Sequence, residues 1–395
     1  HKRVAALCAE DAKRESAELT FNHVANFMYH MAQYEELPDP STMRMIEEAL
    51  LRKIAARGGE NVRRDGSNGA AFVSAQAARR AADAIQPHLV SNTLWAFSVL
   101  RYKPGESLMR AFDDLIEARV EEYSDQSLSM TIFAYANLAF EPSSSTTAKL
   151  LTQCEARVTN GGFTPQGLSN SFWGWAVLGV ATSNLVEAYA KRFAETSLGD
   201  SGNNADNADA LSRVDLVQIY QASLAFAHCV EVNGRLECDV ATDDDGPASK
   251  PGKNLLRGAL LERAKEVWEQ TSTGRVTISS LHREVSETLT FMAIPHEIEA
   301  VADDNFSLDI ALRGRAVAIE VDGPSHFFAN RQSEYMGADK LREKVLEAKG
   351  WTVRTRPATR NAVWFSRFGF FSPRGFSPKE EKSKRAALTT PHTNR

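Results

Sequence analysis

An apolar stretch with one aromatic residue near its middle recurs in the first part of the chain. Its clearest copies begin at Val90, Leu128 and Leu168, so that they are 38 and 40 residues apart, and looser copies begin at Val24 and Leu216. An equivalent position in four copies is aromatic: Tyr29, Trp95, Phe133 and Trp173. A repeat of this length holds a pair of helices, and one such pair cannot bury its apolar face alone. The pattern therefore predicts that the copies stack on one another.

The spacing of apolar residues predicts that each unit is a helical hairpin. In one aromatic helix Leu94, Phe97 and Leu100 recur at helical spacing, and second helices are predicted at 107–121 and 144–156. Stacked hairpins form an α-helical repeat solenoid, an α-α superhelix with a concave surface. The alternative is a non-repetitive helical bundle, whose helices can share a pattern by chance. The joint recurrence of the period, the aromatic residue and a Ser-Asn pair favours the solenoid.

Three segments interrupt this pattern. Residues 58–82 and 198–210 contain Gly, Asp and Asn turn signals and few apolar side chains, so both are predicted to be flexible insertions. Residues 242–252 include three consecutive Asp and are expected to link two domains. Residues 1–241 are accordingly assigned to the helical repeats.

The pattern changes after the linker. Two amphipathic connecting helices are predicted within 253–294, followed by a small α/β domain at 295–365. The basic tail, 366–395, has few features of a packed core and is predicted to be disordered. The elements predicted within the α/β domain are strands at 296–302 and 306–312, a helix at 337–349, a strand at 351–356 and an aromatic segment at 361–365.

One further strand carries the most reactive side chains of the α/β domain. Val317, Ile319 and Val321 alternate with polar or small residues, so Glu320 and Asp322 project from the same face of this strand. A Gly-Pro turn ends the strand, and a histidine at position 326 follows within three residues.

A tight Arg-Gly turn after Leu312 is expected to pair the preceding strand with this one. In the favoured register Asp309 lies opposite Ala318, and the apolar residues of the two strands coincide. This pairing predicts that Asp309, Glu320 and Asp322 share one face of the hairpin.

Residues 318–327 read Ala-Ile-Glu-Val-Asp-Gly-Pro-Ser-His-Phe, and residues 344–353 read Lys-Val-Leu-Glu-Ala-Lys-Gly-Trp-Thr-Val. Together with Trp364, this pattern resembles the RAP domain. The helical units resemble octotricopeptide repeats, whose period is similar. The two resemblances imply an RNA-binding protein of mitochondria or plastids, acting on single-stranded organellar transcripts.

The RAP resemblance also implies a restriction-endonuclease-like fold of the PD-(D/E)XK group, close to very-short-patch-repair enzymes. Asp309 and Glu320 would then match the Mg²⁺ ligands of such nucleases. The position two after Glu320, where these nucleases often have Lys, is Asp322. Lys340 or Lys344 on the following helix is a candidate for the missing cation.

Three interpretations of the strand end therefore remain open. In a ribonuclease, Asp309 and Glu320 would bind Mg²⁺, and Asp322 and His326 would complete a catalytic site with His326 as general acid or base. The absence of the expected Lys weakens this interpretation.

In an RNA-binding surface, His326, Arg354 and Arg356 would contact phosphates and stacked bases. Clustered carboxylates repel RNA and weaken this second interpretation. In the third, Asp322 and His326 only stabilise the turn through hydrogen bonds.

The helical repeats offer separate candidates for RNA contact. Asn92, Asn170 and Gln218 occupy one equivalent position, which Met130 interrupts. Helical-repeat proteins read bases with polar residues at fixed positions, whereas an Asn near a helix start is as often a cap. The repeated aromatic residues are expected to pack between units rather than to stack on bases.

Bulk composition limits the remaining possibilities. The formal charge of −5 does not by itself suggest a nucleic-acid partner. The longest apolar run, 172–181, is too short for a membrane helix, so no membrane insertion is expected. The four cysteines lack CxxC spacing and are expected to be reduced thiols. Since the chain begins with His1, its targeting peptide is not visible.

These observations predict an organellar RNA-binding protein that acts in transcript stability, processing or translation and needs no cofactor for binding. The alternatives are a metal-dependent endoribonuclease that uses Mg²⁺ and a scaffold that binds other proteins.

Overall fold

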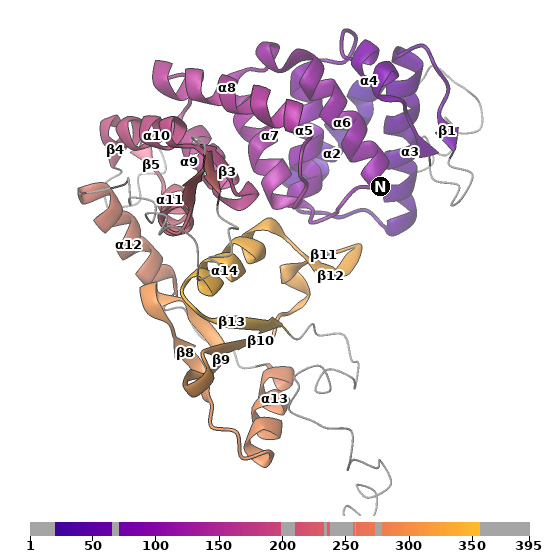
Figure 1. Cartoon of the computed structure of the whole chain (residues 1–395). Coiled ribbons are helices and arrows are strands. Elements are labelled where there is room, and N and C mark those ends of the chain that lie inside the picture. The colour runs from indigo at the N-terminus through magenta and orange to yellow at the C-terminus, as the bar shows by residue number, and fades with distance from the viewer. Residues whose placement is uncertain are drawn as a thin grey trace, which may run out of the picture.

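The computed structural model describes residues 20–64, 71–198, 210–232, 235–237, 256, 258–272 and 279–355. The chain is mostly helical, with a small mixed sheet in its C-terminal region (Figure 1). The predicted linker at 242–252, the aromatic segment at 361–365 and the tail at 366–395 lie outside the described residues, as do Arg356 and Trp364.

The N-terminal helices form two layers, which we call the first and the second layer. Consecutive helices of the first layer pack side by side, and those of the second layer cover them. The first layer consists of α2 (Phe21–Gln33), α5 (Pro87–Val99), α7 (Asp125–Asn137), α9 (Pro165–Leu178), α11 (Arg213–Ala227) and α12 (Ala259–Ser272). The second layer consists of α3 (Pro40–Arg57), α4 (Ala75–Ala81), α6 (Glu106–Arg119), the short η1 (Val120–Glu122), α8 (Ser144–Asn160) and α10 (Ser183–Glu195).

Hydroxyl side chains set where several first-layer helices begin. Ser124, Thr164 and Ser212 each accept a hydrogen bond from a backbone N–H in the first turn of α7, α9 and α11. Such N-caps satisfy amides that the helix itself leaves without partners. The Ser and Asn residues of the repeated pattern lie further inside the helices and are not the caps.

The repeated aromatic residues join neighbouring units, as expected. The ring centroids of Tyr29 and Trp95 are 5.3 Å apart, and those of Phe133 and Trp173 are 5.4 Å apart. Trp173 is buried, whereas Trp95 and Phe133 are only partly buried against the same core. These distances are typical of favourable aromatic pairs.

The prediction of a flexible insertion at 58–82 is wrong for its second half. Residues 75–81 form α4, and Ala77, Ala78 and Ala81 are fully buried. Alanine has the highest helix propensity and fits where backbones approach closely, so this alanine-rich run packs without large side chains. The described residues of the helical part also form three small β-sheets. Two of them are two-stranded and pair β1 (Arg63–Arg64) with β2 (Ala71–Phe72) and β4 (Ser197–Leu198) with β5 (Ala210–Leu211). The third has the strand order β3 (Val180–Thr182), β7 (Arg235–Glu237), β6 (Val230–Val232).

The C-terminal sheet has the strand order β13-β10-β9-β8. Strands β10 and β13 are parallel, and the other two pairs are antiparallel. Its strands are β8 (Glu297–Val301), β9 (Ser307–Leu312), β10 (Val317–Glu320) and β13 (Thr352–Thr355). Three short 3₁₀ helices, η2 (Asp303–Asn305), η3 (Arg313–Arg315) and η4 (Pro324–His326), connect or end these strands.

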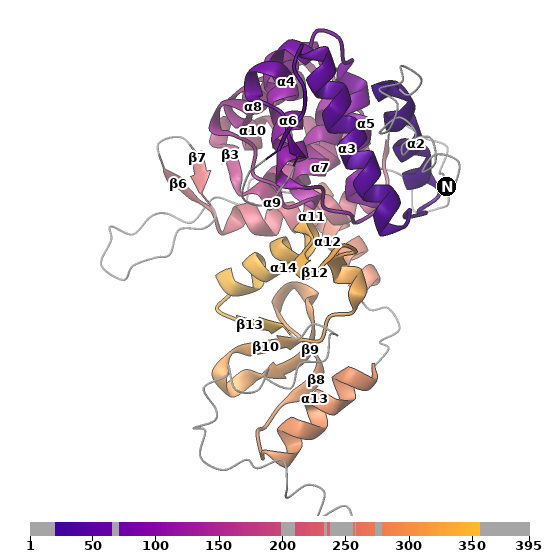
Figure 2. The same ribbon diagram turned by 90° about the vertical axis from the view of Figure 1, so that its right-hand side faces the viewer.

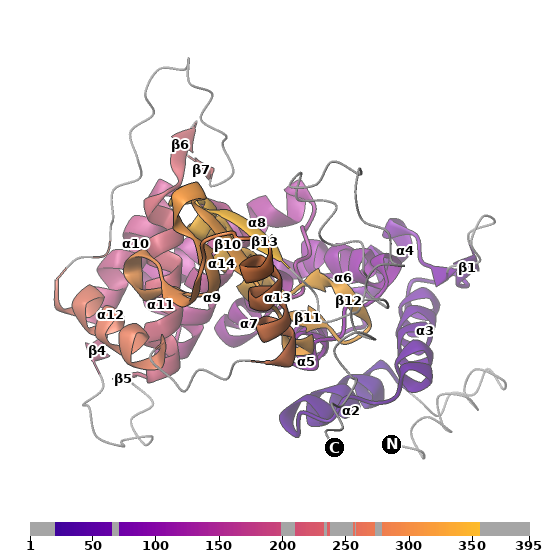
Figure 3. The ribbon, with the colours of Figure 1, turned by 90° about the horizontal axis from the view of Figure 1, so that it is seen from below.

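Two helices cover the C-terminal sheet. Val285 and Leu289 of α13 (Ser280–Phe291) pack with Ile310, Leu312 and Ile319 of the sheet. Helix α14 (Gly337–Ala348) lies on the other side, between the sheet and the helical layers (Figure 2). Seen from below, α13 lies in front of the sheet and α14 behind it (Figure 3).

The expected register of the central hairpin is wrong by two residues. Strands β9 and β10 pair Leu312 with Val317 and Ile310 with Ile319, because the turn spans four residues rather than two. It closes at Ala316, whose φ of 49° is left-handed, a conformation that the sequence does not announce because it is unusual for alanine. A register shift of two residues leaves every side chain on the sheet face that was predicted for it. Asp309 now lies opposite Glu320 instead of Ala318.

The β-hairpin that follows β10 and its turn was not predicted. Residues 327–336 were expected to be a polar connection, but Phe327–Phe328 (β11) and Arg331–Tyr335 (β12) pair with each other. The turn of this hairpin reaches the helical layers. The Ala329 N–H donates to Arg101 O at 2.7 Å, and Asn330 exchanges two hydrogen bonds with the backbone of Lys103.

Helix α14 begins against the first layer. Its first residue, Gly337, is so close to α7 that a Cβ there would lie 2.0 Å from Ala136 O and 2.9 Å from the Val177 side chain. Only glycine allows this approach. The α/β domain is therefore docked on the C-terminal ends of first-layer helices.

We predict that Gly337→Ala destabilises the protein by about 1–3 kcal/mol, because the added methyl group forces α14 away from α7. Urea unfolding measures this loss. Gly314→Ala is the matched control, since no atom lies within 4 Å of a Cβ there. Equal unfolding free energies for the two variants would contradict the close docking.

No helix in the described part of the chain is long and apolar enough to cross a membrane. The expectation of reduced cysteines holds for the buried, free Cys154 and is wrong for Cys229, which is disulfide-bonded.

Candidate functional site

Glu320 forms a buried ion pair at the end of β10. The residue is 5% exposed, and its Oε2 lies 2.8 Å from Arg342 Nη1 on α14. Arg342 also donates to the carbonyl of Ser307. The cation that meets Glu320 is therefore Arg342, and neither Lys340 nor Lys344 takes this place.

The surroundings of Glu320 disfavour its charge. Burial raises its pKa to about 7, against the opposing effect of Arg342, and the negative charges of Asp309 and Asp322 act in the same direction as burial. Oε1 of Glu320 is buried without a hydrogen-bond partner among the described residues. The carboxyl group thus sits near the balance between its charged and neutral forms.

Asp309 lies beside this pair but makes a separate contact. Its Oδ2 accepts a hydrogen bond of 2.6 Å from the Val321 N–H, just where β10 ends. The structure therefore brings Asp309, Glu320 and Asp322 to one end of the hairpin, as the shared face predicted.

Asp322 and His326 form a second group at the end of the strand. The Tyr335 hydroxyl donates to Asp322, and burial raises the pKa of that carboxyl despite this hydrogen bond. His326 Nδ1 lies 2.7 Å from Asp339 Oδ1 and 3.5 Å from Asp322 Oδ1. The contact with Asp339, followed by the charge of Asp322, raises the pKa of His326 above its usual value.

The hydrogen bonds of Asp322 and His326 lead to Tyr335 and Asp339 rather than to the backbone of the turn, and one side of His326 remains accessible. The His326 side chain is 43% exposed, and Arg354 on β13 is also exposed. A partly exposed histidine held by two carboxylates can carry a positive charge toward an anionic ligand.

The polar candidates of the helical repeats occupy equivalent positions on first-layer helices, and two of them, Asn170 and Gln218, are in contact. Gln218 Nε2 donates to Asn170 Oδ1 at 3.1 Å, although 48 residues separate them. We call this exposed or partly exposed strip the amide surface. It comprises Asn22, Asn26, Asn92, Gln126, Gln166, Asn170 and Gln218.

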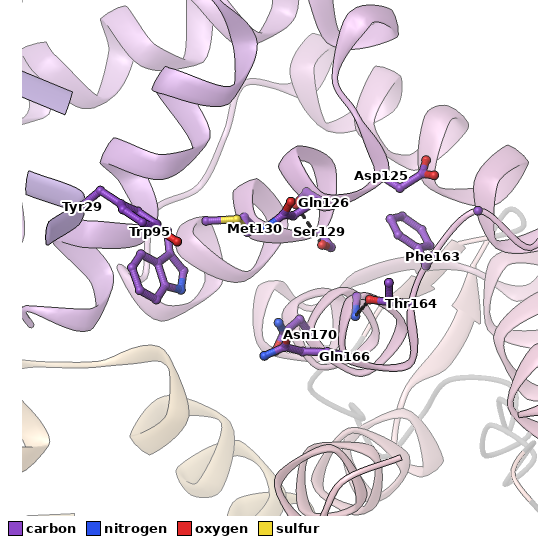
Figure 4. Close-up of a pocket in the computed structure, with 12 residues that line it drawn as sticks. Tyr29, Trp95, Asp125, Gln126, Ser129, Met130, Phe163, Thr164, Gln166 and Asn170 are labelled. Atoms are coloured by element: carbon purple, nitrogen blue, oxygen red, sulfur yellow. Dashed lines mark hydrogen bonds between the residues drawn. The ribbon is translucent and has the colours of Figure 1, made fainter. Parts of the chain in front are cut away.

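A cavity of about 460 Å³ opens within the amide surface. Figure 4 shows Gln126 and Ser129 of α7 together with Gln166 and Asn170 of α9 around it, and Trp95 at one end. Tyr29 and Phe163 complete an aromatic border. Flat rings beside amide groups offer a stacking surface and hydrogen-bond donors and acceptors at once.

The sequence pattern missed three participants of the strand-end site: Arg342, Asp339 and Tyr335. Helical spacing offered one usable signal, because Asp339 and Arg342 are three residues apart and share a face of α14. Tyr335 could not be placed without the β11–β12 hairpin.

Comparison with protein families matches residues 319–358 to the RAP domain, a span that contains Glu320, Asp322, His326 and Arg342. These residues form a RAP domain. A RAP domain suggests RNA binding. The matched residues do not include the whole α/β domain. The same sheet also contains β8 and β9, and α13 packs on it, although all three precede the matched residues. The chain matches no curated protein.

Proposed function

We propose that the protein binds single-stranded RNA along the amide surface, with the RAP domain beside it as a second contact. Amides read the edges of bases, which are free to be read only where RNA is unpaired. The RAP match supports RNA as the partner. The observation that carries the proposal is that Asn170 contacts Gln218 and lines a cavity together with Tyr29 and Trp95, while Asn92 occupies the equivalent position of α5.

The amide surface also suggests how the RNA would lie. Equivalent positions on consecutive first-layer helices repeat along the strip, so successive nucleotides would meet successive helical units. This arrangement agrees with the proposed octotricopeptide-like solenoid. Few charged side chains border the cavity, with Asp125 among its lining residues, so base contacts rather than phosphate contacts would provide most of the affinity.

The cellular role that we propose follows from the resemblance to organellar RAP proteins. The protein would act in mitochondria or plastids on the stability, processing or translation of a transcript. Binding would need no metal, because the amides and aromatic rings of the first layer are available without one.

The test measures binding of short random-sequence single-stranded RNA and of duplex RNA at low and at moderate salt. We expect retention of the single strands, an affinity that falls only slightly as the salt concentration rises because few phosphates are contacted, and weaker binding of the duplex. No retention of RNA at low salt would overturn the proposal and favour a scaffold for protein partners.

A further inference from the structure

A group of potential metal ligands lies on the C-terminal sheet and shares Asp309 with the surroundings of the Glu320–Arg342 pair. It comprises His282 of α13, Glu299 of β8 and Asp309 of β9. One ligand atom from each of the three side chains lies within 4.8 Å of the other two. Each residue comes from a different element, so the fold rather than sequence proximity creates the group.

The pairing of β8 with β9 brings the two carboxylates together. Ile298 pairs with Ile310 and Ala300 pairs with Leu308, so Glu299 lies between them opposite Asp309. Glu299 has a φ of 51°, which is a left-handed conformation that residues other than glycine seldom adopt. The strand therefore departs from regular geometry at the residue that carries the carboxylate.

His282 faces this pair from the helix that covers the sheet. The residue is 3% exposed, and its Nδ1 lies 3.4 Å from Glu299 Oε1, longer than the usual hydrogen bond between such groups. Its Nε2 is buried without a hydrogen-bond partner in the described part of the chain. A buried imidazole normally has hydrogen-bond partners, so the present neighbours leave the ring incompletely satisfied.

The two neighbouring carboxylates of Glu299 and Asp309 also favour a bound cation. Two carboxylates face each other across adjacent strands, and one oxygen of Asp309 is already held by the Val321 N–H. A divalent ion would offset both negative charges and take a lone pair of the imidazole.

We propose that His282, Glu299 and Asp309 bind a divalent transition-metal ion of the Mn²⁺ or Zn²⁺ type. One imidazole with two carboxylates suits such ions better than Mg²⁺ or Ca²⁺, which prefer oxygen ligands alone. Three protein ligands leave further positions for water. Glu320 is not in this group of ligand atoms, and its Oε2 lies against Arg342. The proposal does not depend on RNA binding.

The test titrates the full chain with Mn²⁺ and measures free Mn²⁺ by electron paramagnetic resonance. We expect one bound ion per chain, and at least about tenfold weaker binding in Asp309→Asn and in Glu299→Gln, each of which removes a charged ligand. Glu297→Gln is the matched control, since Glu297 lies on the same strand and pairs with Arg313 at the surface. This variant should bind Mn²⁺ like the wild type.

Thermal unfolding of each variant without metal shows whether it is folded. In the folded wild type, Mn²⁺ should raise the unfolding temperature, and in both ligand variants this rise should be lost. Absence of Mn²⁺ and Zn²⁺ binding by the wild type would overturn the proposal and leave His282 as a partner of Glu299 only. Unchanged Mn²⁺ affinity in both folded ligand variants would overturn it as well.

Discussion

Replacing Arg342 with leucine is expected to destabilise the protein by about 3–5 kcal/mol at about pH 8.5, because this change leaves the carboxylate of Glu320 buried without its partner. Glu320 is 5% exposed and 2.8 Å from Arg342, so water cannot replace the lost guanidinium. Denaturant unfolding at several pH values measures the effect.

The loss should depend on pH in a defined direction. Burial raises the folded-state pKa of Glu320 to about 7 from the ordinary value of 4.5, so its protonated form is favoured by folding. The stabilisation that this proton gives the folded state is complete at a pH below the unfolded-state pKa of 4.5, and it is lost as the pH rises through about 7. Without Arg342 the folded-state pKa rises further. Below pH 5 the carboxyl is protonated in both proteins, and Arg342→Leu should cost much less there.

Two variants distinguish the loss of the Glu320–Arg342 ion pair from the loss of packing around the Arg342 side chain. Glu320→Gln combined with Arg342→Leu removes the buried charge, so the difference between acidic and alkaline pH should disappear. Arg313→Leu removes an exposed pair with Glu297 and should change stability by no more than about 1 kcal/mol. If Arg342→Leu were equally destabilising at all pH values, the buried carboxylate would not be the cause.

The second large effect concerns RNA. Replacing Asn92, Asn170 and Gln218 together with alanine is expected to weaken RNA binding by about 100-fold, because three hydrogen bonds of about 1 kcal/mol each are lost. All three are at least partly exposed, so the protein should remain folded. Fluorescence anisotropy with a labelled single strand enriched from a random-sequence pool measures the affinity.

The control for this variant changes amides on the second layer. Gln76 and Asn160 are exposed on α4 and α8, and replacing both with alanine should leave the affinity unchanged. Equal losses in the two variants, or no loss in the first, would argue against base reading by the amide surface.

The sequence predicted most reliably what repeats or alternates. The equivalent positions of Asn92, Asn170 and Gln218 followed from aligning the units, whereas the contact between Asn170 and Gln218 was found only in the structure. The shared face of Asp309 and Glu320 also followed from strand alternation, and it survived an error of two residues in the register because that error is even.

What could not be predicted depends on tertiary placement or unusual backbone geometry. The left-handed Ala316 lengthened the turn and shifted the register. Arg342 is 22 residues after Glu320 in sequence, and nothing in the helical pattern of α14 distinguishes it from Lys340 or Lys344 as the partner of Glu320. The alanine-rich α4 looked like an insertion because its small side chains pack closely without large apolar groups.

The position of RNA on the first layer can be tested by crosslinking. RNA that contains 4-thiouridine is crosslinked to the full chain, and mass spectrometry identifies the crosslinked peptides. We expect crosslinks in α5, α7 and α9, near the partly exposed Trp95 and Phe133, and their loss in the triple alanine variant. Crosslinks confined to the second layer, or confined to the RAP domain, would contradict that position.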